Sequence, residues 1–202
     1  MPRVLTQADV ADFRERLSET ATRLFASRGR EAFTMRELAG ELGVSAMTPY
    51  RYFRDKDEIL ASVRARAFAR FAEALELAIS TPGDALQKAG AVYEAYIAFA
   101  FGEPAAYRLM FDLSQPDEEA YPELVEASRR ARATMTDYVR LLVKEGLLQG
   151  DPELMGYVFW SALHGAVVLQ LAGKLDPQYD FRTITGEAFR ALSQSYRPTR
   201  PG

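Results

Sequence analysis

The fold of this chain is decided by residues 34–53, TMRELAGELGVSAMTPYRYF. Thr34 and the glutamate three residues later form the signature of a capping box, which predicts that a helix begins here. Gly43 stands where this helix should end, because glycine tolerates the left-handed backbone of a C-terminal cap. Ser45 is then placed to cap a second short helix, expected over Ala46–Phe53. The segment therefore predicts two short helices joined by a tight turn.

Two short helices joined by a turn with a glycine are typical of a helix-turn-helix, whose second helix enters the major groove of DNA. Such a helix needs side chains that donate hydrogen bonds to DNA phosphates, and short or methyl-bearing side chains near its start that can contact bases. Side chains of the donor type are Thr48, Tyr50, Tyr52 and Lys56. Ala46 and Met47 can contact thymine methyl groups. The sequence thus predicts a DNA-reading surface on this segment.

The stretch resembles the TetR (tetracycline-repressor) family of transcriptional regulators. The likeness is carried by Thr34, Leu38, Ala39, Gly43, Val44, Ser45, Thr48, Tyr50, Tyr52, Phe53, Lys56, Ile59 and Leu60. The resemblance implies base-edge contacts from Arg36, Ala46, Met47 and Arg51. It implies phosphate contacts from Thr34, Thr48, Tyr50, Tyr52 and Lys56, with Ser45 in the same DNA-binding set. The alternative is two ordinary short helices of a helical bundle.

Pro49 departs from the leucine that is commoner in the family. Proline lacks a backbone N–H and crowds the carbonyl four residues earlier, which here belongs to Ser45. This residue puts the path of the reading helix in question, but not its existence.

The composition indicates one or two domains with a sizeable core, because the 202 residues are 48% hydrophobic. The absence of cysteine excludes disulfides and thiolate chemistry. The start of the sequence lacks an apolar signal core, and the longest apolar run, Tyr157–Leu171, is interrupted by polar residues. We therefore expect a cytoplasmic protein.

The net charge of −3 is unevenly distributed along the chain. Residues 1–70 contain 13 Lys and Arg against 10 Asp and Glu, whereas the remaining residues contain 12 against 18. A positive N-terminal third on an acidic body fits a DNA-reading head joined to a separate regulatory body.

Helical periodicity and turn signals predict an all-α chain of about nine helices, as the TetR resemblance also implies. Residues 1–54 are predicted to form the helix-turn-helix domain, with a helix over 55–80 leading into a ligand-binding and dimerisation domain, 55–202. The expected body helices are Ala85–Phe101, a short helix through Tyr107–Phe111, Pro122–Leu148, a helix from Asp151 to about Ala172, and Phe181–Ser195.

The body is rich in aromatic residues and methionine, which can line a cavity for a small effector. The ligand-binding candidates are Tyr96, Phe99, Met110, Phe111, Met135, Tyr138, Trp160 and His164. Taken one at a time, each of them is also explained as ordinary core. The aromatic bias favours an apolar or aromatic effector. Gly102–Phe111 and Trp160–Gly165 resemble a branch of the family with Pro-x-x-Tyr-x-Leu-Met-Phe and Trp-x-x-x-His-Gly motifs.

His164 is the sole histidine. On a largely apolar helix it is more simply a hydrogen-bonded core residue than a ligand or base. No second histidine or cysteine exists for a conventional zinc site, and no nucleophile with a base can be identified, so no cofactor or metal is expected.

DNA half-sites one turn apart require a two-fold protein, so a homodimer is predicted through helices near 151–172 and 181–195. The helix over Leu154–Ala172 is apolar nearly all round, which requires a second partner for one of its faces.

These observations predict a homodimeric regulator that binds a palindromic operator in double-stranded DNA, and a repressor released by a small effector. A ligand-binding helical module without DNA function is the first alternative. An all-α enzyme that uses His164 as a base, with a partner such as Tyr138, is the second. The effector, the operator, and the choice between repression and activation stay open at this point.

Overall fold

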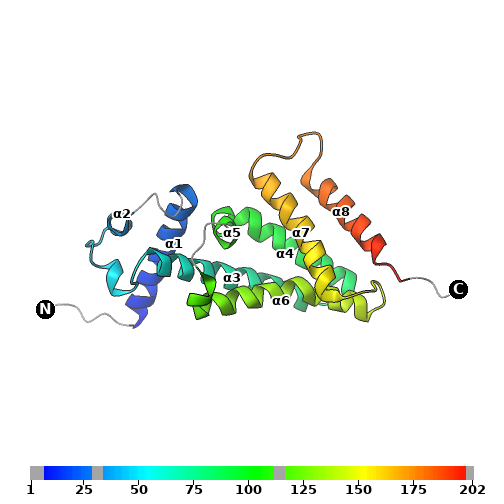
Figure 1. Cartoon of the computed structure of the whole chain (residues 1–202), viewed down its shortest axis with the longest axis horizontal. Coiled ribbons are helices and arrows are strands. Elements are labelled where there is room, and N and C mark those ends of the chain that lie inside the picture. Colours follow the sequence, from blue (N-terminus) through cyan, green and yellow to red (C-terminus); the bar gives the residue numbers. More distant parts are fainter. Residues whose placement is uncertain (1–6, 29–33, 112–116, 199–202) are drawn as a thin grey trace. The chain divides into compact units, whose positions relative to one another are not determined.

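The computed structural model describes residues 7–28, 34–111 and 117–198, and every regular element in these ranges is helical (Figure 1). The elements are α1 Gln7–Arg28, α2 Met35–Glu41, the 3₁₀ turn η1 Pro49–Arg51, α3 Lys56–Ser80, α4 Ala85–Gly102, α5 Pro104–Phe111, the 3₁₀ turn η2 Glu118–Ala120, α6 Pro122–Lys144, α7 Pro152–Leu171 and α8 Phe181–Ser195. The all-α prediction is confirmed, and eight α-helices in the described ranges are close to the expected nine.

Both ends of α2 are stabilised as the sequence predicts. The Glu37 N–H donates to the Thr34 hydroxyl at 3.1 Å, and the Thr34 N–H donates to the Glu37 carboxylate at 2.7 Å, which completes the capping box. At the other end, Gly43 adopts φ +68°. The N–H groups of Val44 and Gly43 donate to the carbonyls of Ala39 and Gly40, each at 3.0 Å. This pair of bonds is a Schellman motif, which fixes the turn after α2.

The α-helix expected over Ala46–Phe53 is wrong: the structure has only the 3₁₀ turn η1 in this segment. Most of its bonds reach back three residues, with the Thr48 N–H donating to the Ser45 carbonyl at 2.9 Å and the Tyr52 N–H to the Pro49 carbonyl at 3.0 Å, and one four-residue bond from the Phe53 N–H to Pro49 closes it. Pro49 explains the change, because it cannot donate the bond to Ser45 that an α-helix requires. The predicted Ser45 cap is also wrong, since the Ser45 hydroxyl pairs with the Thr48 hydroxyl at 3.1 Å.

Replacing Gly43 with alanine is expected to lower the free energy of unfolding by about 1 kcal/mol or more. A Cβ at Gly43 meets no atom within 4 Å, so the cost comes from the backbone at φ +68° alone. Gly40 in α2 is the matched control, because its Cβ would also meet open space but its backbone is helical. Chemical denaturation of both variants tests this, and equal stabilities would contradict it.

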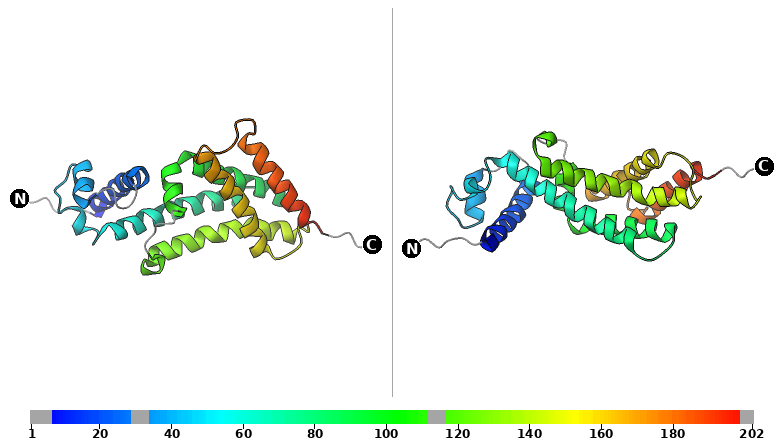
Figure 2. Two further views of the ribbon diagram at one scale, coloured as in Figure 1. Left: turned by 45° about the horizontal axis from the view of Figure 1, so that its top comes forward. Right: turned by 90° about the horizontal axis from the view of Figure 1, so that it is seen from below.

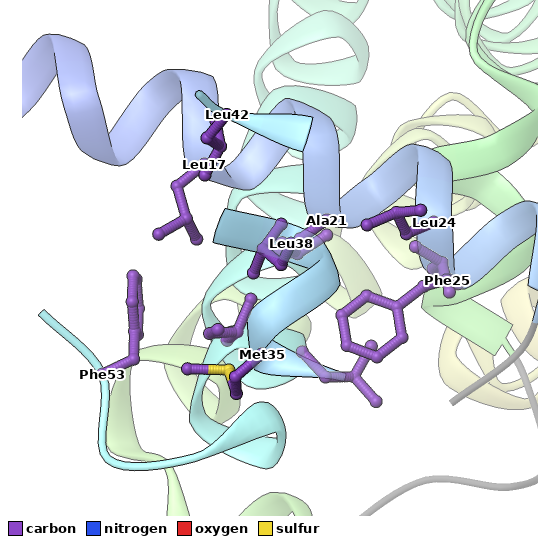
Figure 3. Close-up of a cluster of buried hydrophobic side chains, with 12 residues drawn as sticks. Leu17, Ala21, Leu24, Phe25, Met35, Leu38, Leu42 and Phe53 are labelled. Atoms are coloured by element: carbon purple, nitrogen blue, oxygen red, sulfur yellow. The ribbon is translucent and has the colours of Figure 1, made fainter. Parts of the chain in front are cut away.

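The chain divides into two compact units, residues 1–70 with 105–128, and residues 71–104 with 129–202. Figure 3 shows the core of the first unit, in which α1, α2 and α3 bury their apolar faces against one another. Leu17, Ala21, Leu38 and Ile59 are fully buried there, and Leu109 of α5 joins the same cluster. The predicted assignment of DNA binding to 1–54 and ligand binding to 55–202 stays a proposal.

The second unit is built from the end of α3 with α4, most of α6, α7 and α8. Helices α7 and α8 lie side by side along their length (Figure 2). Gly156 of α7 allows a close approach to α6, because a Cβ there would lie 2.6 Å from the Thr136 Cγ2 atom. Among the described helices, α7 alone is long and apolar enough to cross a membrane by length and composition, a test that core helices also pass.

Candidate functional site

The turn around η1 presents most of the predicted DNA-reading residues to solvent. Met47 is 67% exposed and Tyr50 is 49% exposed. Ala46 and Arg51 are also exposed, whereas Pro49 is buried. The turn thus keeps Pro49 inside the fold, while Met47, Tyr50 and Arg51 stay in contact with solvent.

Two guanidinium groups of this region lack a carboxylate partner. Within residues 7–28, 34–111 and 117–198, neither Arg36 nor Arg51 makes an ion pair. Nearby arginines behave differently, since Arg23 pairs with Glu41 at 3.1 Å and Arg54 with Glu58 at 3.2 Å. Arg36 could instead have been an exposed helix residue paired with a neighbouring glutamate, but no such pair exists in these ranges. The guanidinium groups of Arg36 and Arg51 are therefore available to donate to an acceptor outside the protein.

The predicted phosphate donors differ in availability. The Thr34 hydroxyl donates to the Glu37 carboxylate at 3.0 Å, and the N–H and hydroxyl of Thr34 lower the pKa of Glu37. Thr48 is half-buried and shares its hydroxyl with Ser45. Tyr52 is half-buried with its ring 4.8 Å from the ring of Phe13. Lys56, at the first position of α3, is half-buried. Tyr50 is therefore exposed, as is Thr34, whereas the other three donors are half-buried.

The second unit contains a cavity of about 260 Å³ between α4, α6, α7 and α8. It is lined by Leu86, Ala89, Gly90, Val92, Tyr93, Tyr96, Met135, Tyr138, Leu142, Phe159, Trp160, Leu163, Phe189 and Ser193. Its walls are largely apolar, with a few phenol and hydroxyl groups. This composition is typical of small-molecule sites.

Polar groups on the cavity wall form a short hydrogen-bonded chain. The Trp160 Nε1–H donates to the Tyr96 hydroxyl at 3.0 Å, and this hydroxyl lies 3.5 Å from Nδ1 of His164. The Tyr93 and Thr185 hydroxyls are 2.7 Å apart, which ties α4 to α8. Burial lowers the pKa of His164, so the imidazole is held neutral.

Four of the eight predicted ligand residues line this cavity: Tyr96, Met135, Tyr138 and Trp160. His164 lies behind them, against Tyr96 and Trp160, and Phe99 packs its ring 5.2 Å from that of Phe71. Met110 and Phe111 belong to the first unit, where the Phe111 ring lies 5.1 Å from the ring of Tyr107. Their assignment as ligand residues stays a prediction.

Sequence reasoning missed most of the α4 wall. Leu86, Ala89 and Tyr93 precede Tyr96 by ten, seven and three residues, which places them on one face of the helix. That spacing was available in the sequence. Phe189 and Ser193 reach the cavity only through the packing of α8, for which no local signal exists.

Two family models match the chain. The model for bacterial regulatory proteins of the tetR family matches residues 17–63, and the model for the tetracyclin repressor-like C-terminal domain matches residues 89–192, just over half of the chain. The chain belongs to the TetR family. The matched N-terminal segment contains the capped α2, the Gly43 turn and η1, which carried the resemblance in sequence.

Two HTH-type transcriptional regulators are similar to this chain at moderate identity. The HTH-type transcriptional activator FasR of Mycolicibacterium smegmatis is 29% identical over 126 residues, which cover 62% of this chain and 56% of FasR. The regulator Rv0681 of Mycobacterium tuberculosis is 27% identical over 191 residues, which cover 94% of this chain and 84% of the relative. The match to FasR thus spans little more than half of its length.

Solved structures share the TetR-family fold. A protein of unknown function from Rhodococcus sp. RHA1 has a TM-score of 0.79 at 24% identity, covering 98% of this chain and all of the other. The regulatory protein SCO4313 has a TM-score of 0.76 at 22% identity, covering 94% of this chain and 98% of the other. At these identities the likeness concerns the fold alone.

The sole histidine of this TetR-family chain provides a pH-dependent test of the cavity wall. Because burial lowers the pKa of His164 in the folded state, the unfolded chain binds the additional proton first as the pH falls. The contribution of His164 to stability is therefore complete above the unfolded pKa of about 6.5 and is lost as the pH drops below it. Denaturation curves between pH 8 and 5 should show a smaller loss for His164→Gln than for wild type. An unchanged pH slope would contradict the buried, neutral imidazole.

Proposed function

We propose that the protein is a homodimeric regulator of transcription that binds operator DNA through the segment Ser45–Tyr52 and responds to a small apolar effector. The observation that carries this proposal is the exposed turn after α2. It combines apolar tips at Ala46 and Met47 with the unpaired Arg51 guanidinium. Arginine forks read guanine, and short apolar tips contact thymine methyl groups.

Dimerisation is proposed through one face of α7, together with α8. Leu154, Tyr157, Val168 and Leu169 of α7 are 45–59% exposed. Tyr157 and Val168 are eleven residues apart, close to three helical turns, so they lie on the same side of the helix. An exposed apolar stripe of this kind favours a protein partner, and a second copy supplies the two-fold symmetry that paired half-sites require.

The effector is proposed to bind in the cavity of the second unit. An effector changes operator affinity only if it binds one conformation of the protein better than the other. We propose release from the operator, hence repression. FasR is named an activator, so a reporter assay with and without effector is the direct test of whether this protein represses or activates.

The placement of Trp160 and His164 in one cluster supports membership of the Trp-x-x-x-His-Gly branch. We also propose that the protein acts in the cytoplasm.

The salt dependence of operator binding tests the proposed mode of binding. Fluorescence anisotropy with duplexes from the DNA flanking the coding region should give a slope of log K against log salt steeper than about −3, because each neutralised phosphate contributes about −0.9. Lys56→Ala should make the slope shallower by about 1 per subunit, and Tyr50→Phe should weaken binding without that change. A slope near zero, or unchanged affinity in both variants, would rule out the phosphate assignment.

A further inference from the structure

The cavity of the second unit is lined without a single charged side chain. Its 14 lining residues are apolar or aromatic, apart from the hydroxyl of Ser193 and the polar tips of three tyrosines and Trp160. A charged group placed in such a cavity loses its water and gains no countercharge, which is strongly unfavourable. The walls therefore select against an anionic or cationic group inside the cavity.

The three lining tyrosines differ in how their hydroxyls are satisfied. Tyr93 pairs with Thr185 at 2.7 Å, and the Tyr96 hydroxyl accepts the Trp160 Nε1–H at 3.0 Å. In the part of the chain that the structure describes, the Tyr138 hydroxyl makes no hydrogen bond. Burial, and secondarily the nearby Tyr96 phenol, raises the pKa of Tyr138, so its phenol keeps its proton and remains a donor.

Tyr138 is half-buried and borders the cavity, so a bound acceptor would take the place of water as the partner of its hydroxyl. The donor is fixed on α6, one turn from Met135, which lines the same wall. The Tyr138 hydroxyl is thus an available donor held in place by α6, and in the described residues the Ser193 hydroxyl on α8 is the other lining hydroxyl that makes no hydrogen bond.

We propose that the cavity admits an uncharged effector with an apolar body and one hydrogen-bond acceptor, to which the Tyr138 hydroxyl donates. This inference rests on the proposed effector-responsive function and specifies its ligand class. Aryl ketones, esters and lactones fit the description. A volume of about 260 Å³ suits a small ligand, since it lies near the lower end of the range of small-molecule sites.

Three isosteric probes test this inference: acetophenone as the neutral acceptor, cumene as the same shape without an acceptor, and benzoate as the anion. Titration calorimetry measures each with the wild type, with Tyr138→Phe, and with Ser193→Ala as the control at the other lining hydroxyl. Tyr138→Phe removes only an unpaired hydroxyl, so its melting temperature should not fall below that of the wild type.

Acetophenone binding is expected to weaken about tenfold in Tyr138→Phe, while cumene binding changes less than about twofold in either variant. Benzoate should bind the wild type at least about tenfold more weakly than acetophenone. The inference is overturned if Tyr138→Phe affects acetophenone and cumene alike, if benzoate binds as tightly as acetophenone, or if none of the three binds. Operator binding measured on the same preparations without probe separates these outcomes from failure of the proposed DNA-binding function.

Discussion

Replacing Arg51 with alanine is expected to weaken operator binding by roughly 10- to 100-fold per half-site. An arginine fork on guanine discriminates by about 1–3 kcal/mol, and each 1.4 kcal/mol is tenfold in affinity. Arg51 ends the exposed η1 turn and has no ion pair in the described ranges, so its removal should leave the fold intact. Anisotropy titrations at fixed salt measure the loss.

Two further variants identify the kind of contact that Arg51 makes. Arg51→Lys keeps the charge but loses the planar fork, so base reading predicts a loss close to that of alanine, whereas a phosphate contact predicts nearly full affinity. Arg132→Ala is the control, because Arg132 lies on α6 of the other compact unit, is exposed, and makes no ion pair in the described residues. An equal effect at Arg132 would show that only overall charge matters.

The second large effect is expected at Gly156, where alanine should lower the free energy of unfolding by about 1–3 kcal/mol. The added Cβ would lie 2.6 Å from the Thr136 Cγ2 atom and 2.9 Å from the Met135 carbonyl oxygen. The second contact is with the backbone, so α6 and α7 must separate to relieve it. Urea denaturation of the variant measures the loss.

Gly102→Ala is the matched control for Gly156→Ala. Gly102 is the last residue of α4, and a Cβ there meets no atom within 4 Å. Its replacement should change stability by less than about 0.5 kcal/mol, or increase it. Equal stability of the two variants would contradict the close approach of α6 and α7.

Local signals in the sequence were sufficient for most of the fold. The capping box at Thr34 and the glycine turn at Gly43 fixed α2, and the predicted span of α8 matches the structure. The error at Ala46–Phe53 came from interpreting Ser45 as the cap of an α-helix, whereas the missing N–H of Pro49 favours 3₁₀ geometry in this segment.

The candidate sites were less predictable, because they depend on packing between distant segments. The exposure of Arg51 agrees with its predicted place on the DNA-reading segment, but its lack of an ion pair in the described residues could not be predicted. Four of the eight predicted ligand residues line the cavity, since apolar residues look alike in sequence whether they fill a core or border a space. The close contact of Gly156 with α6 of the same chain likewise depends on packing that no local signal gives.

The central claim is that two copies of the Ser45–Tyr52 segment read one duplex. Hydroxyl-radical footprinting on the DNA that flanks the coding region tests it most directly. We predict two protected half-sites whose centres lie about 34–36 Å apart, with two chains bound to each duplex. In Arg51→Ala, both half-sites should lose their protection together. A single protected stretch from one chain, or a footprint unchanged in Arg51→Ala, would contradict the account.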